Sequence, residues 1–115
     1  MMPFPAALDA LPGVPGRFAL RVEPEHPAFE GHFPDDPLLS GLIQVDWALR
    51  LGCESFAITG VFRRLDHLKF QAPIRPDEPV ELSLSWEAAA GELAFRYAGD
   101  HGPKSQGIAV FSPAP

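Results

Sequence analysis

Residues 30–52 read EGHFPDDPLLSGLIQVDWALRLG, and this stretch decides how the rest of the chain can fold. It opens as a loop stiffened by prolines and closes as a mostly apolar run. Ser40 is of a residue type preferred at helix N-caps, so we expect a helix that runs from there to about Phe56. Its apolar side chains project in nearly every direction, apart from one narrow polar stripe. Such a helix is typically buried rather than laid on a surface.

Segments that alternate between apolar and polar residues come both before and after this helix in the sequence. Residues 17–23 alternate cleanly, which predicts a half-buried strand before the loop. Four further strands are predicted after the helix, over residues 61–71, 80–87, 92–97 and 105–111. In the first of these the alternation slips between Leu65 and Leu68, which predicts either a bulge or an inward-facing His67.

This order of elements predicts a single α+β domain. Strands joined by tight turns are adjacent and mostly antiparallel, so we expect a curved sheet of five to six strands wrapped around a long central helix. We expect residues 1–16 to be an N-terminal capping segment with a helical turn over residues 6–11, and residues 17–115 to be the domain itself. So small a sheet leaves an open edge and an incompletely covered helix, which favours pairing with a second copy.

Composition and charge narrow the classes of function. The chain has 115 residues, of which 46% are hydrophobic and 21% are charged, as in ordinary globular domains. Its net charge of −6 argues against a general nucleic-acid-binding protein, which would need a basic surface. Cys53 is the only cysteine, which excludes an internal disulfide and favours a reducing cytoplasm. No Cys/His cluster indicates a zinc site, and no apolar run approaches the roughly 20 residues that span a bilayer.

Two ionisable residues of the opening stretch, His32 and Asp46, stand fourteen positions apart (46 − 32) with the helix start between them. Histidine exchanges protons near neutral pH, so His32 is the candidate base. An apolar helix would desolvate Asp46, whose carboxyl group could then act as an acid or hold a polarised water. The N–H of Gly41 lies at the positive end of the helix dipole and could stabilise charge on a thioester carbonyl. Together these groups suit removal of a proton beside an acyl thioester and loss of a β-hydroxyl group.

Each of these residues also has a plainer interpretation. A histidine beside Gly and Pro often makes only hydrogen bonds within its loop, and Ser-Gly begins many helices. Asp46 and Arg50, spaced four apart, fit a solvated stripe held by weak ion pairs. His26 and His101 are expected to face solvent, and Cys53 to belong to the core rather than act as a nucleophile.

The opening stretch also resembles a known family. Gly-His-Phe-Pro at 31–34, an Asp-Xaa-Pro turn at 35–37, Gly41 and an acid at 46 are similar to the β-hydroxyacyl–acyl carrier protein dehydratases of the hot-dog fold. HLKFQAPIRP at 67–76 is similar to the strand and turn that follow the helix in that family. QVDWA at 44–48 and LSW at 84–86 look most like the short dehydratases of aryl polyene pigment biosynthesis. The chain departs from the family's pattern in Ser40, where a proline is usual, and in Asp35-Asp36, which replaces a turn that contains glycine.

The resemblance implies a hot-dog domain whose active site is shared between two subunits. His32 of one subunit and Asp46 of the other would be the catalytic pair, and the Gly41 N–H would hold the carbonyl. It implies a hydro-lyase that converts 3-hydroxyacyl thioesters into trans-2-enoyl thioesters, in fatty acid, aryl polyene or polyketide-type synthesis, without a cofactor or metal ion. The substrate would be carried on the phosphopantetheine of an acyl carrier protein. The assembly would be a homodimer or larger, or a pair with a homologous subunit.

We expect two supporting groups of residues, an acyl tunnel and a basic patch for the acidic carrier protein. The tunnel would be lined by Phe33, Leu42, Leu49 and Phe56. The basic patch would consist of Arg63, Arg64 and Lys69, with Arg75. A hot-dog thioesterase and a non-catalytic acyl-binding partner subunit stay open as other functions. The acyl length, an aryl or alkyl substrate, isomerase activity and the choice between carrier protein and coenzyme A are also left open.

Overall fold

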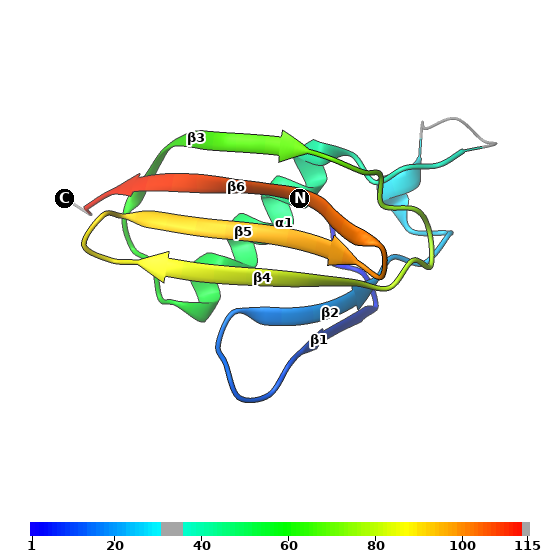
Figure 1. The fold of residues 1–115 in the computed structure, drawn as a ribbon, viewed down its shortest axis with the longest axis horizontal. Helices are drawn as coiled ribbons and strands as arrows, with labels where there is room; N and C mark the ends of the chain where they lie inside the picture. The colour runs from blue at the N-terminus through cyan, green and yellow to red at the C-terminus, as the bar shows by residue number, and fades with distance from the viewer. Residues whose placement is uncertain (31–35, 114–115) are drawn as a thin grey trace.

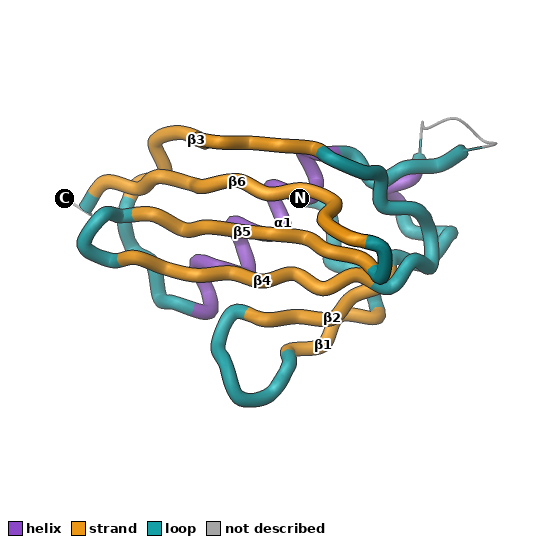
Figure 2. Tube along the Cα trace, viewed as in Figure 1, coloured by secondary structure: helices purple, strands orange, loops and turns teal. Residues whose placement is uncertain are grey.

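The computed structural model describes residues 1–30 and 36–113 of the chain. Its elements, in chain order, are β1 (Ala7–Ala10), β2 (Arg17–Arg21), the short 3-10 helix η1 (Pro27–Phe29), α1 (Gly41–Ser55), β3 (Val61–Phe70), β4 (Val80–Glu87), β5 (Glu92–Gly99) and β6 (Gly102–Ser112). The strands of the described residues form one antiparallel sheet of six, in the order β1-β2-β4-β5-β6-β3, and α1 lies across one face of it (Figures 1 and 2). This confirms the predicted α+β architecture.

Ser40 fixes the start of the helix, as predicted. Its backbone is extended (φ −63°, ψ 147°), and its Oγ accepts a hydrogen bond from the Ile43 N–H at 3.2 Å. This satisfies one of the amide groups that a helix N-terminus otherwise leaves without a partner. The helix ends at Ser55, and Phe56 follows as its C-cap. The predicted boundaries are therefore confirmed.

The core lies between α1 and the sheet face that meets it. Inward side chains form rows across the strands, because the register pairs Leu84 of β4 with Phe95 of β5, and Phe95 with Gly107 of β6. The helix approaches this face closely at Gly52, where an added Cβ would stand 2.4 Å from Leu93 Cδ2. A larger residue at position 52 would therefore push the helix and the candidate site away from the sheet.

The N-terminal segment differs from the prediction. Residues 6–11 form no helical turn, because Ala7–Ala10 are the strand β1 and pair with β2 from Ala7↔Arg21 to Ala10↔Phe18. A single isolated helical turn has little stability of its own, whereas the outer edge of β2 offers backbone partners for a strand. The division of the chain at residue 16 stays a prediction.

Burial of α1 is one-sided, which corrects the expectation that it is covered all round. Gln44 and Gly52 face the strands, where they contact Tyr97 and Leu93. Leu42 lies away from the core and is 81% exposed. One sheet covers only one side of a helix, and on the other side Ile43, Leu49 and Cys53 are only partly buried while Leu42 is left open.

The strand β3 forms the outer edge of the sheet next to β6 (Figure 1). Eight of its ten residues are exposed, and Phe70 at its end is 54% exposed. The pairing with β6 shifts register twice, the second time between Asp66 and Lys69, where His67 has a φ of 54°. The predicted bulge is therefore confirmed, and His67 points outward as part of it rather than inward.

Candidate active site

Asp46, the candidate acid, lies in the second turn of α1. Its side chain is 42% exposed, and its Oδ2 accepts a hydrogen bond from Arg50 Nη1 at 3.1 Å. The two residues form an i,i+4 ion pair, as the plainer interpretation expected. The described part of a single chain therefore leaves Asp46 more exposed than the sequence predicted.

Gly41 begins the helix five positions before Asp46 (46 − 41) and lines a hollow of about 470 Å³. The ring of Phe70 lies directly over it, because an added Cβ at Gly41 would stand 2.4 Å from Phe70 Cζ. Within residues 1–30 and 36–113, no acceptor takes a hydrogen bond from the Gly41 N–H. An amide at a helix N-terminus that borders a hollow can bind a carbonyl oxygen or an anion.

His32 and Phe33, two of the predicted site residues, lie outside the described residues. Both flanks of their loop are anchored in the part that is described. On one side, the Glu30 N–H donates to Pro27 O at 3.0 Å at the end of η1. On the other side, buried Leu39 donates its N–H to Ile74 O at 2.9 Å. The loop therefore starts and ends on fixed elements, and its second flank leads directly into α1.

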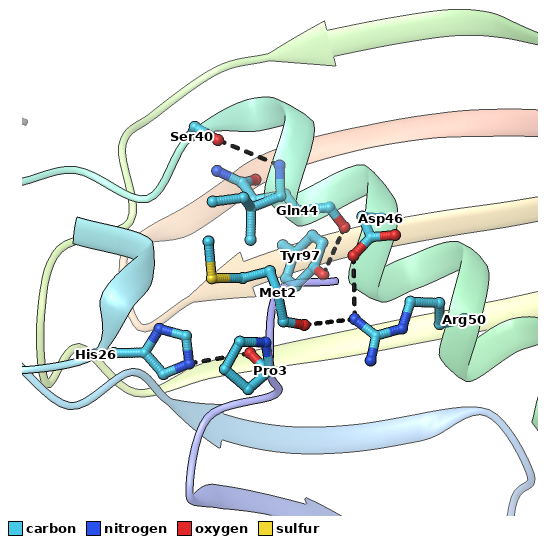
Figure 3. Close-up of polar contacts among 9 residues, drawn as sticks. Met2, Pro3, His26, Ser40, Gln44, Asp46, Arg50 and Tyr97 are labelled. Atoms are coloured by element: carbon cyan, nitrogen blue, oxygen red, sulfur yellow. Dashed lines mark hydrogen bonds and ion pairs between the residues drawn. The ribbon is translucent and has the colours of Figure 1, made fainter. Parts of the chain in front are cut away.

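His26 is buried rather than exposed, which corrects the sequence prediction. Only 4% of it is accessible, and its ring packs edge-on against Trp47 with centroids 5.6 Å apart. Its Nδ1 accepts a hydrogen bond from the Ala28 N–H at 2.9 Å, which leaves the proton on Nε2 to donate to Pro3 O at 3.0 Å (Figure 3). Pro3, which helps to cover His26, lies 23 positions away in the sequence, so a local alternation pattern could not predict this burial.

A buried polar network beneath the helix start was missed by the sequence reasoning. Gln44 is 3% exposed; its Nε2 donates to Leu39 O at 3.0 Å, and its Oε1 accepts from Ser105 Oγ at 2.6 Å. The Tyr97 hydroxyl donates to the Gln44 backbone oxygen at 2.8 Å (Figure 3). Burial, with the negative charge of Asp46 added to it, raises the pKa of Tyr97, so this hydroxyl remains a donor. The sequence does carry one signal for this network, because Gln44 is a lone amide side chain among the mostly apolar residues of the helix.

Three of the residues expected to line an acyl tunnel are described by the structure, and these three are not gathered in one place. Leu42 is exposed beside the hollow at Gly41, whereas Leu49 and Phe56 are partly buried against the core. Leu42 and Phe56 are fourteen positions apart (56 − 42), or about 21 Å along a helix axis. A channel that used all of them would have to follow the whole length of α1.

The expected basic patch is spread along the outer strand. Arg63, Arg64 and Lys69 are all exposed on β3, but the ends of this group are six residues apart (69 − 63), or about 20 Å in a strand. Arg64 Nε also pairs with Asp66 Oδ1 at 3.1 Å, which partly neutralises it. Arg75 likewise pairs with Asp36, at 3.2 Å. The structure gives a row of separated charges rather than one cluster.

Two other predictions about single residues are confirmed. Cys53 is partly buried against the core, and burial raises the pKa of its thiol, which makes it a poor nucleophile. His101 is exposed in the turn between β5 and β6.

In residues 1–30 and 36–113, no three His, Cys, Asp or Glu side chains gather as a metal site would require. None of the helices in those ranges has the length and apolar character needed to cross a membrane.

Comparison with known proteins bears on both fold and function. A family model described as ApeI-like, ApeI dehydratase, matches residues 15–108. A chain of the dehydratase heterocomplex ApeI:P from Xenorhabdus doucetiae superposes with a TM-score of 0.82 and 29% identity, covering 98% of this chain and 100% of that one. An uncharacterised protein from Erwinia carotovora subsp. atroseptica gives 0.79 and 30%, with 98% of each chain covered. The predicted hot-dog fold and the resemblance to aryl polyene dehydratases are confirmed.

Curated relatives point to the same chemistry over a shorter stretch. The 3-hydroxyacyl-[acyl-carrier-protein] dehydratase FabZ of Natranaerobius thermophilus is 25% identical over 89 residues, which are 71% of this chain and 63% of that protein. The enzyme of the same name from Caulobacter sp. (strain K31) is 24% identical over 82 residues, 64% of this chain and 50% of that protein. The chain therefore spans less than two thirds of the length of these relatives.

Proposed function

The chain belongs to the ApeI-like dehydratase family, and from that premise we propose that it dehydrates 3-hydroxyacyl thioesters to trans-2-enoyl thioesters. The observation that carries the proposal is the arrangement on α1. Gly41 places a helix N-terminal amide beside a hollow, and the carboxylate of Asp46 follows in the next turn. A carbonyl-binding amide and a carboxyl group that can exchange a proton, both on one rigid element, are two of the three groups that the reaction needs.

In the proposed mechanism, His32 removes a proton from C2 of the bound thioester. The Gly41 N–H stabilises the negative charge that develops on the thioester oxygen. The electron pair of the broken C2–H bond forms the C2=C3 double bond as the C3–O bond breaks. Asp46, which must be in its carboxylic-acid form for this step, gives its proton to the departing hydroxyl, so water leaves; the proton that His32 took from C2 then returns to Asp46, which restores both groups. The electrons balance within the substrate, so the step needs neither an oxidant nor a reductant.

We propose that a second subunit completes this site. The far side of α1 exposes Leu42, and the outer edge of β3 with Phe70 is also exposed, so apolar surface and backbone partners lie together beside Gly41. A homologous subunit or a second copy could cover both. The similar chain from a dehydratase heterocomplex supports a homologous subunit as one such partner.

The test is to supply a 3-hydroxyacyl thioester, on acyl carrier protein and on coenzyme A, and to follow loss of water by mass spectrometry. We expect formation of the enoyl thioester, and a fall of about 100-fold or more in kcat for His32→Ala and for Asp46→Asn, because each removes a proton-transfer group. Wild-type turnover retained by both variants would contradict the assignment. Release of free thiol without an enoyl product would instead indicate the thioesterase.

One observation favours a second candidate function, that of a partner subunit that binds acyl groups without turning them over. With 42% of its side chain exposed, Asp46 of the single chain is not the desolvated acid that the reaction requires. The heterocomplex relative also shows that similar chains occur in assemblies of dehydratases. Acyl binding without turnover, both alone and with a homologous subunit, would support this candidate.

A further inference from the structure

Residues 2–4, which we call the N-terminal strap, cross the face of α1 that carries Asp46 (Figure 3). Arg50 Nη1 donates a hydrogen bond to Met2 O at 2.7 Å. The guanidinium carbon of Arg50 lies 4.1 Å from the centroid of the Phe4 ring, in cation–π geometry. His26 holds the strap from the other side through its bond to Pro3 O. The strap is therefore fixed at successive residues.

The same nitrogen of Arg50 links the strap to the candidate acid. Nη1 also donates to Asp46 Oδ2 at 3.1 Å, so one guanidinium bridges a backbone oxygen and the carboxylate. An isolated i,i+4 ion pair on a helix surface is weak and holds its partners loosely. Here Arg50 has two further contacts and is 24% exposed, against 42% for Asp46. Arg50 is thus the fixed member of the pair, and Asp46 is the member that it orients.

We propose that Arg50 is a positioning residue for Asp46 and that the N-terminal strap holds Arg50 in place. The proposal rests on the proposed function. With Oδ2 engaged by Arg50 at 3.1 Å, the second oxygen, Oδ1, is left to carry the proton that goes to the 3-hydroxyl group of the substrate. The strap then contributes to catalysis without touching the substrate, because it restricts the guanidinium to one orientation.

The first test compares Arg50→Gln, Arg50→Lys and a matched control, Arg17→Gln. Arg17 also pairs with a carboxylate, that of Glu81, but the two side chains lie on β2 and β4 and are 45% and 41% exposed. We expect Arg50→Gln to lower kcat by about 10-fold with KM changed less than about twofold, because a misplaced acid affects the transition state and not binding. Lysine should recover part of the loss, and Arg17→Gln should behave as wild type. All variants should show the same cooperative melting.

The second test asks whether the strap acts through Arg50. Phe4→Leu keeps an apolar side chain near Trp47, whose ring centroid is 6.4 Å from that of Phe4, but removes the aromatic face under the guanidinium. We expect a smaller fall in kcat, of about threefold, which disappears when Phe4→Leu is combined with Arg50→Gln, because residues that act in series are not additive.

The outcomes separate this inference from the proposed function. A wild-type chain that forms no enoyl thioester, alone or with a homologous subunit, overturns the proposed function and the inference with it. An active wild type whose Arg50→Gln variant matches Arg17→Gln overturns only the role of Arg50. Equal effects of Phe4→Leu in the wild-type and Arg50→Gln backgrounds overturn the role of the strap.

Discussion

Gly41 has two separate reasons to lack a side chain. An added Cβ would collide with the Phe70 ring, and it would also narrow the hollow into which the Gly41 N–H can bind a carbonyl. The first reason concerns packing and the second concerns catalysis. Because the Phe70 ring is 54% exposed and is the free end of a side chain, it can move aside, so the two reasons can be separated by experiment.

We predict that Gly41→Ala changes the free energy of unfolding by less than about 1 kcal/mol, since the gain in helix propensity offsets displacement of an exposed ring. Activity should fall about 10-fold or more if the amide binds the carbonyl. The double variant Gly41→Ala/Phe70→Ala removes the collision. Denaturant unfolding and kcat/KM of both variants decide the question: activity restored in the double variant would show that Gly41 serves packing alone.

Single residues were the least predictable part of the molecule from sequence. The spacing of His32, Gly41 and Asp46 could be read directly, because it is local and set by one loop and one helix. The burial of His26 could not be predicted, because the cover comes from a distant segment, the N-terminal strap with Pro3. Arg50 could be expected to pair with Asp46 but not with Met2 O, which is 48 positions away.

At the scale of elements, the first turn of α1 is held from three directions. Ser40 caps it, the Gln44 side chain ties it to Leu39 and Ser105, and Tyr97 bonds to the Gln44 backbone oxygen. Local patterns predicted the helix and five of the strands, because alternation and capping are properties of contiguous residues. β1 was not predicted because it depends on the free edge of β2, which no local pattern in residues 6–11 reports.

Ser40 gives a prediction at this scale. Ser40→Ala should lower the free energy of unfolding by about 1 kcal/mol, because the Ile43 N–H loses its acceptor. Ser40→Pro should be close to wild type, because the native φ of −63° suits proline and the smaller entropy of the unfolded chain offsets the lost cap by about 0.4–1 kcal/mol. Urea unfolding measures both. A suitable control is Ser83→Ala, whose residue is exposed on β4. A proline variant less stable than the alanine variant would contradict the argument.

The whole molecule presents one face that a single chain leaves incomplete. Leu42 and Phe70, the last residue of β3, lie beside the hollow at Gly41, whereas the strap covers α1 at Arg50 and β1 forms the other edge of the sheet. The sequence predicted the open edge from the small number of strands. It could not show that Asp46 would be 42% exposed, because the burial of a helix depends on how many sides the sheet covers.

If a second subunit covers this face, a charge placed there should weaken assembly and catalysis together. We predict that Leu42→Glu, at an 81% exposed position, shifts the sedimentation of the chain, or of its complex with a homologous subunit, toward the single subunit. Dehydration should fall in proportion to the lost assembly, because the proposed site takes residues from both subunits. Val14→Glu is the control, since Val14 is 56% exposed in the loop between β1 and β2, away from this face. Assembly that withstands Leu42→Glu while activity is retained would mean that the uncovered side of α1 is not the interface.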